Sequence, residues 1–343
     1  RQRKPLRDAI ATFRRSGRVA EAAEGQLLLA ELEYRRGEVE RALTAARAAY
    51  RLARQTGTAT ALDASLDLLA RLCAAAGNYG KARQHATELV NHATERQDCH
   101  QKVVALSRLA QIAWQQEDLE AAIRAAETAV EEASANGETE ATAEARRELG
   151  VLLLSAGCAH AATEQFTLAL KIPQSIESRV RLYLARGSGA MCRGEYASAA
   201  RDFRKAIREA KLQTDRRLEV EATAALAAAE AALADTQNNG NRRARAAKLA
   251  ERALRRSRRL RDAALVEKAA FARQAANRGE DALAEGAPLP GTPREAADAL
   301  VQLAYRMDSL TVAEACYQEV EWLSTLKQQE RPYRCDFRLP FLP

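Results

Sequence analysis

Small apolar residues recur along the chain at a nearly constant step. The aligned alanines are Ala42, Ala82, Ala122, Ala162 and Ala199, which are separated by 40, 40, 40 and 37 residues. Around each alanine, further apolar positions follow at spacings of three and four residues, the spacing of an amphipathic α-helix. Because alanine takes little room, helices that carry it at fixed positions can approach closely. The pattern predicts a series of paired antiparallel helices.

Two copies of the pattern also show a glycine at the turn between the helices and aromatic residues on the second helix. One copy contains Leu149, Gly150, Leu153, Gly157, Ala162, Phe166 and Ala169, and the next contains Gly187, Gly194, Tyr196, Ala199, Phe203 and Ala206. This register resembles the tetratricopeptide repeat. The resemblance implies an all-α fold, a right-handed α-α superhelix of about seven helix pairs. The period of about 40 residues, longer than the usual ~34, places it in the long-helix branch of the family.

The later part of the chain is less regular. A polar turn at 236–240 precedes a sixth second helix, and a helical stretch follows at about 264–284. We expect six repeats and this extra stretch in residues 1–286, a Pro- and Gly-rich linker at 287–293, a final helix pair at 294–328 and an extended tail at 329–343. The chain starts with Arg1 instead of methionine, so we expect a fragment of a longer protein.

Composition agrees with a long helical array. The chain is 47% hydrophobic but only 5% aromatic, and Gly and Pro number 16 and 8. Alanine, leucine, arginine and glutamate are strong helix formers. The net charge of +7 favours acidic partners or simply a well-solvated surface. No window holds 18 consecutive apolar residues, so no membrane span and no membrane partner are expected.

Residues that carry chemistry do not gather into a recognisable pattern. The four histidines, His85, His92, His100 and His160, have no metal-ligand spacing. The six cysteines include no Cys-x-x-Cys pair and lie mostly among apolar residues, as small buried thiols do. We therefore predict no catalytic residue, no metal site and no cofactor. The cysteine pattern favours a reducing intracellular compartment, nuclear or cytoplasmic.

One predicted helix is strongly basic. Between residues 242 and 261 Glu251 is the only acidic residue. The candidate basic patch consists of Arg242, Arg243, Arg245, Lys248, Arg252, Arg255, Arg256 and Arg259. Such a helix is dense enough to bind phosphates or an acidic protein surface, yet no aromatic residues are interleaved for base stacking. A solvated face, an acidic protein partner and, less favoured, nucleic acid remain the alternatives.

The first helix of each repeat supplies the candidate partner-binding groove. In tetratricopeptide arrays these helices line the surface where peptides or partner helices lie. The register places seven residues there: Glu31, Tyr34, Arg71, Gln111, Trp114, Arg147 and Met191. Trp114 is the candidate anchor, and packing between repeats is the alternative. The Lys and Asn clamp that binds chaperone tails in this family is absent from the matching positions.

A finer resemblance covers residues 103–326. This part of the chain resembles the C-terminal repeats of anaphase-promoting complex subunit 5. The similar features are the segment from Val103 to Trp114, the 40-residue step, the polar interruption at 237–243 and the final helical pair with its Pro-containing tail. The resemblance implies a non-catalytic scaffold subunit of a nuclear ubiquitin ligase with a role in the cell cycle. The sequence favours a scaffold that binds other protein subunits. A free-standing adaptor that binds a peptide in its groove, and a nucleic-acid-binding solenoid, are the alternatives.

Overall fold

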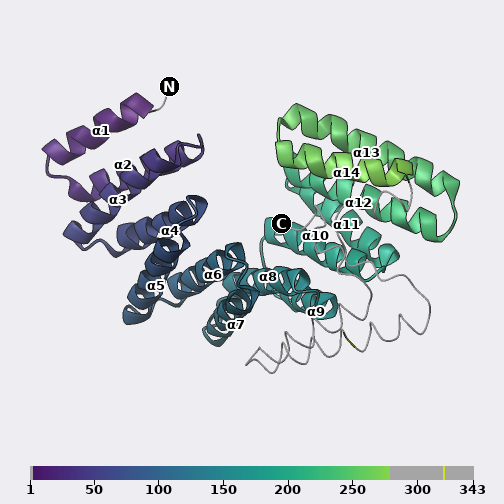
Figure 1. Cartoon of the computed structure of the whole chain (residues 1–343), viewed down its shortest axis with the longest axis horizontal. Helices are drawn as coiled ribbons and strands as arrows, with labels where there is room; N and C mark the ends of the chain where they lie inside the picture. Colours follow the sequence, from purple (N-terminus) through teal and green to yellow (C-terminus); the bar gives the residue numbers. More distant parts are fainter. Residues whose placement is uncertain (1–2, 279–319, 321–343) are drawn as a thin grey trace. The chain divides into compact units, whose positions relative to one another are not determined.

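The computed structural model describes residues 3–278 and Val320, and the described residues form α-helices joined by short turns, with no strand. The helices, shown in Figure 1, are α1 (Arg3–Arg15), α2 (Val19–Tyr34), α3 (Val39–Thr56), α4 (Ala59–Ala75), α5 (Tyr79–Glu95), α6 (Cys99–Gln115), α7 (Leu119–Ala135), α8 (Thr139–Ser155), α9 (Ala159–Leu170), α10 (Ile176–Cys192), α11 (Tyr196–Leu212), α12 (Arg216–Thr236), α13 (Gly240–Leu260) and α14 (Ala263–Arg278). The chain divides into two compact units, Arg1–Ala141 and Thr142–Pro343, which are described separately.

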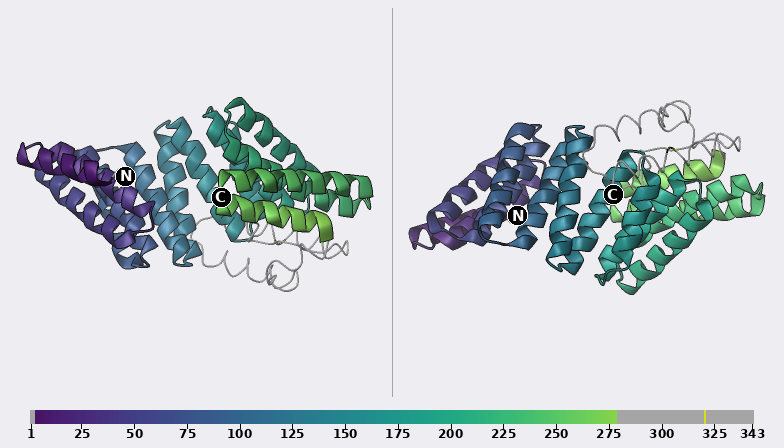
Figure 2. Two further views of the ribbon diagram at one scale, coloured as in Figure 1. Left: turned by 90° about the horizontal axis from the view of Figure 1, so that it is seen from above. Right: turned by 90° about the horizontal axis from the view of Figure 1, so that it is seen from below.

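Six helix pairs correspond to the predicted repeats. We number the copies one to six, from α2–α3 to α12–α13, and call the first helix of each pair the A helix and the second the B helix. Within each unit, consecutive helices pack on one another, as in α2 with α3 and α10 with α11, and A helices also contact the next A helix, as in α2 with α4 and α4 with α6. Figure 2 shows these neighbouring helices side by side within each unit. The predicted all-α repeat fold is confirmed. The predicted linker, final pair and tail lie outside the described residues, apart from Val320.

The aligned alanines occupy equivalent sites in the core. Ala42, Ala82, Ala122, Ala162 and Ala199 are all fully buried. Each lies in the first turn of its B helix, where a larger side chain would push the helix away from its neighbours. The turns are equally regular: Gly37, Gly77, Gly157 and Gly194 adopt positive φ between A and B helices, and Glu117 does so in the third copy. Glycine reaches this left-handed region without steric cost.

Two aromatic side chains fill the space that two glycines leave open. Phe166 and Phe203 are fully buried on α9 and α11. A Cβ atom added to Gly150 would lie 2.4 Å from Cε1 of Phe166, and one added to Gly187 would lie 2.4 Å from Cε1 of Phe203. The ring edge therefore lies directly against the backbone of the A helix, and no other residue type fits there.

Cysteine placement follows the expected pattern in the described residues. Cys73, Cys158 and Cys192 are buried, and Cys99 is half-buried. No described group of three His, Cys, Asp or Glu side chains is arranged to hold a metal ion. Within the same residues, no helix is both long enough and apolar enough to cross a bilayer.

Candidate partner-binding surfaces

The A helices of the first unit carry a continuous chain of ion pairs. Arg71 on α4 lies 3.3 Å from the Glu31 carboxylate on α2 and 3.2 Å from Asp67 on its own helix. Arg108 on α6 donates to Asp67 at 2.7 Å and to the Gln111 amide oxygen at 2.5 Å. Three of the predicted groove residues, Glu31, Arg71 and Gln111, thus lie in one network across three A helices. We call this surface the A-helix face.

Exposed apolar side chains lie on the same helices. Trp114 on α6 is 47% exposed and Tyr34 on α2 is 38% exposed. Leu28, one turn before Glu31, is 60% exposed. Because each charged group of the network has an opposite charge or an amide beside it, the side chains that remain for a partner are mainly apolar. Large exposed apolar side chains with a polar surround are typical of protein-binding surfaces.

Leu28 and Arg108 join the A-helix face although neither was predicted. The 40-residue step relates both to Leu68, which is buried. The repeat register therefore indicated a core position for them. Only the ion pair with Asp67, 41 residues earlier in the chain, shows that Arg108 faces the preceding A helix, α4.

The two predicted groove residues of the second unit have a different environment. Arg147 on α8 is largely buried and pairs with Glu144 on the same helix at 2.7 Å. Burial would lower the pKa of the Arg147 guanidinium, but its hydrogen bonds to the Glu144 carboxylate raise it. Met191 on α10 is only 8% exposed and packs in the apolar core. It offers little surface to a partner, because its side chain fills space between helices.

The basic helix α13 is partly neutralised by α12. Arg242 pairs with Glu230 at 2.8 Å, Arg256 pairs with Glu219 at 2.7 Å, and Arg243 pairs with Asp235. These carboxylates precede the basic segment in the sequence, so the local charge count overestimated the patch. The remaining predicted cations are Arg245, Lys248, Arg252, Arg255 and Arg259, which are exposed.

These five cations form one stripe along α13. Their spacing of three and four residues places them on a single face of the helix. The opposite face carries the buried residues Ala246, Ala250, Ala253 and Leu254. Among the described residues, none of the five has a hydrogen bond or ion pair. The basic patch predicted from the sequence is therefore narrower, but it remains available to an anionic partner.

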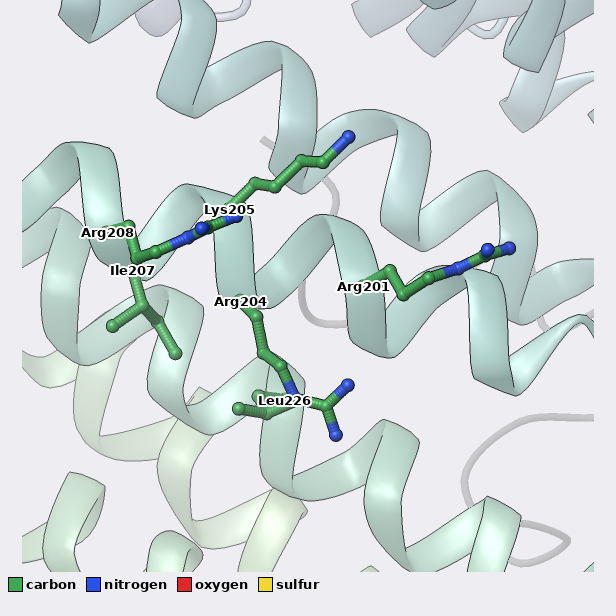
Figure 3. Close-up of a pocket in the computed structure, with 6 residues that line it drawn as sticks. All are labelled: Arg201, Arg204, Lys205, Ile207, Arg208 and Leu226. Carbon is green, nitrogen blue, oxygen red and sulfur yellow. The ribbon is translucent and has the colours of Figure 1, made fainter.

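A second cationic surface lies on α11. Arg201, Arg204, Lys205 and Arg208 line a pocket of about 650 Å³ together with Ile207 and Leu226, as Figure 3 shows. Lys205 lies over the Tyr183 ring, 5.5 Å from its centroid. Arg204 pairs with Glu230, the carboxylate that also holds Arg242. This pocket was not predicted from the sequence, because Leu226, which completes its lining, lies on α12 of the next repeat.

No protein-family model matches the chain, and no curated protein sequence matches it. Several solved structures are similar in fold. BtubC (BKLC) from P. vanneervenii is 21% identical with a TM-score of 0.54, and the match covers 63% of this chain and 92% of that one. The apo form of the quorum sensor NprR from B. thuringiensis is 13% identical with a TM-score of 0.53, over 90% of this chain and 88% of that one.

A third similar structure is a STAND (Signal Transduction ATPase with Numerous Domains) protein with a tetratricopeptide repeat sensor, from Pyrococcus horikoshii. It is 16% identical with a TM-score of 0.57, and the match covers 92% of this chain but only 44% of that protein. At these identities the likeness concerns the fold alone. The chain has the architecture of a tetratricopeptide-like helical repeat array.

Proposed function

We propose that this chain is a non-catalytic protein-interaction scaffold and that it binds a partner protein along the A-helix face of its first unit. The observation that carries the proposal is the exposed indole of Trp114 on a surface whose charges already satisfy one another. A partner that covers Trp114 gains apolar burial without breaking the network of Glu31, Arg71 and Arg108. Because this network ties three A helices together, the surface is held ready before binding.

The proposal is tested by co-purification with the chain carrying Trp114→Ala. We expect loss of partners that wild-type chain retains, since a buried Trp anchor contributes ~2 kcal/mol or more to binding. Leu212→Ala is the matched control, because Leu212 is 77% exposed at the end of α11 and outside the A-helix face. Equal recovery of every partner by the Trp114→Ala and wild-type chains would contradict the proposal.

Membership of a large assembly is the finer form of this function. The resemblance to anaphase-promoting complex subunit 5 would make the chain a scaffold of a ubiquitin ligase inside the cell; it stays a prediction, supported only by the layout of repeats. A native complex that contains the chain and other repeat subunits, identified by mass spectrometry after mild purification, is the expected result. Recovery of the chain as a lone monomer would contradict this form.

A free-standing peptide-binding regulator is the second candidate. Tyr34 and Trp114 favour it, because they occupy the same place at the ends of their A helices, with Ala74 at that place in the copy between them. The small Ala74 between the large Tyr34 and Trp114 leaves space in which a bulky side chain of an extended peptide could lie. Two similar structures are described as a quorum sensor and a repeat sensor, which is consistent with this role. A bound short peptide in the native source would favour it over the scaffold.

Nucleic-acid binding through the stripe on α13 is the third candidate. The exposed Arg245, Lys248, Arg252, Arg255 and Arg259 support it. If the stripe binds phosphates, affinity for an oligonucleotide falls steeply with salt and falls again in Arg252→Gln/Arg255→Gln. A flat salt response would dismiss this candidate.

A further inference from the structure

The pocket on α11 has an equivalent in the first unit. A pocket of about 430 Å³ is lined by Thr44, Arg47, Tyr50 and Arg51 on α3, Leu69 on α4 and His85 on α5. Helices α2, α3 and α4 begin at residues 19, 39 and 59, and α10, α11 and α12 begin at 176, 196 and 216, a constant offset of 157. With this offset, Thr44, Arg47, Tyr50, Arg51 and Leu69 correspond to Arg201, Arg204, Ile207, Arg208 and Leu226, all of which line the pocket in Figure 3.

The shared lining combines two cations with an apolar floor. Arg47 and Arg51, and likewise Arg204 and Arg208, stand one helical turn apart on an exposed face of a B helix. The floor is Tyr50 with Leu69 in the first pocket and Ile207 with Leu226 in the second. Neither lining includes a carboxylate. In the first pocket the nearby Glu88 is held by the Tyr50 hydroxyl, which donates to it at 2.6 Å.

Most of these cations have no partner within the described residues. Arg47, Arg51, Arg201 and Arg208 make no hydrogen bond or ion pair there, whereas Arg204 pairs with Glu230. The arginine pair is also specific to these two copies. The same register positions hold Thr87 and Asn91 in the second copy and Glu127 and Glu131 in the third. The pair is therefore not a requirement of the repeat fold.

We propose that the two pockets are equivalent docking sites for an acidic peptide segment of a partner protein, one that carries a bulky aliphatic side chain among carboxylates. The aliphatic side chain covers the apolar floor. The arginines without a partner in the described residues, Arg47 and Arg51 in the first pocket and Arg208 with Arg201 in the second, receive carboxylates on either side. Charge complementarity selects an acidic ligand. The floor selects a peptide over a nucleic acid, because the second pocket has no aromatic ring on which a base could stack.

This surface is built mainly from B helices, so it differs from the A-helix face of the proposed function. A ligand for it can therefore be found or lost independently of Trp114.

Calorimetric titration with a short synthetic peptide, one leucine flanked by glutamates, tests the proposal on the whole chain. We expect two equivalent sites in wild type, one in Arg47→Glu/Arg51→Glu, one in Arg204→Glu/Arg208→Glu and none in the combined variant. Within each altered pocket the affinity falls by ~10-fold or more. Arg36→Glu/Arg216→Glu is the matched control, because both residues are exposed, lie outside the pockets and give the same change of charge.

Three results would overturn the proposal. The first is two sites in the combined variant with its helical circular dichroism intact. The second is equal binding of a peptide with serine in place of leucine, which would make the interaction a matter of charge alone. The third is tighter binding of a single-stranded oligonucleotide through the same arginines. Binding that survives in Trp114→Ala but not in the combined variant would separate this site from the A-helix face.

Discussion

The contact between A and B helices is made differently in the early and the later copies. Copies one to three have alanine on both sides at the same register: Ala30 with Ala46, Ala70 with Ala86, and Ala110 with Ala126, all nearly or fully buried. Copies four and five have Gly150 with Phe166 and Gly187 with Phe203. The glycine of the A helix lacks the methyl group of alanine, and the phenyl ring of the B helix packs into the space that this leaves. The repeat backbone, with its nearly constant period, therefore accommodates either an alanine–alanine or a glycine–phenylalanine pair at this contact. Packing restricts the combination of the two residues more than either residue alone.

The largest effects on stability are expected from substitutions that disrupt the contact between Gly187 and Phe203 in the fifth copy. Gly187→Ala places a Cβ atom 2.4 Å from the Phe203 ring, so the buried ring or the helix must move. We expect the free energy of unfolding to fall by about 3 kcal/mol, measured by urea denaturation. Gly189→Ala on the same helix is the control. Its Cβ meets nothing closer than 3.6 Å, from Thr163, so alanine there should be neutral or stabilising.

The same substitution should change sign when the ring is removed. Phe203→Ala alone costs about 3 to 5 kcal/mol. In that background Gly187→Ala recreates the alanine pair of the early copies, so it should stabilise by about 1 kcal/mol through helix propensity and partial filling of the cavity. A double-mutant cycle in urea measures the coupling. If Gly187→Ala is equally destabilising in both backgrounds, the two pairs are not interchangeable.

Much of this fold could be predicted from the sequence, because the repeat depends on local spacing. Alanine and glycine positions such as Ala82 and Gly157 specify both the helices and the turns. The candidate surfaces were less predictable, because they join residues from different repeats. Arg108 on α6 is neutralised by Asp67 on α4, and the pocket on α11 is completed by Leu226 of the next repeat. Met191 was placed at the surface, but its size and apolar character draw it into the core.

Acid should lower the stability of the first unit through His85, which is half-buried on α5, whereas the histidine described in the second unit, His160, is exposed. Burial lowers the pKa of His85, Arg47 and Lys81 lower it further, and Glu88 opposes them. The unfolded chain therefore takes up a proton at this side chain at higher pH than the folded chain. As the pH falls below about 6.5, the free energy of unfolding falls, until His85 is also protonated in the folded chain.

The measurement is urea denaturation at pH 7 and pH 5 of wild type and His85→Gln. We expect the variant to lose less stability on acidification than wild type, by less than either packing effect above. His160→Gln is the control, because His160 is exposed on α9. A loss of stability on acidification that is the same in wild type and His85→Gln would rule out the half-buried imidazole as its source.

The smallest expected effect concerns the turns. Copies one, two, four and five place glycine at the positive-φ position between the helices, whereas the third has Glu117 with φ of 62°. A residue with a Cβ atom pays more than about 1 kcal/mol for the left-handed conformation. Glycine avoids this strain, but it loses more conformational entropy on folding, which offsets part of the gain. Glu117→Gly should therefore stabilise the chain by about 0.5 kcal/mol. The reverse change, Gly77→Glu at φ of 73°, should destabilise the chain by a similar amount. Thermal unfolding of both variants and of wild type measures the two effects. Opposite signs of similar size would show that the turn positions of the copies are equivalent. A destabilising Glu117→Gly would mean that the third copy depends on the glutamate side chain.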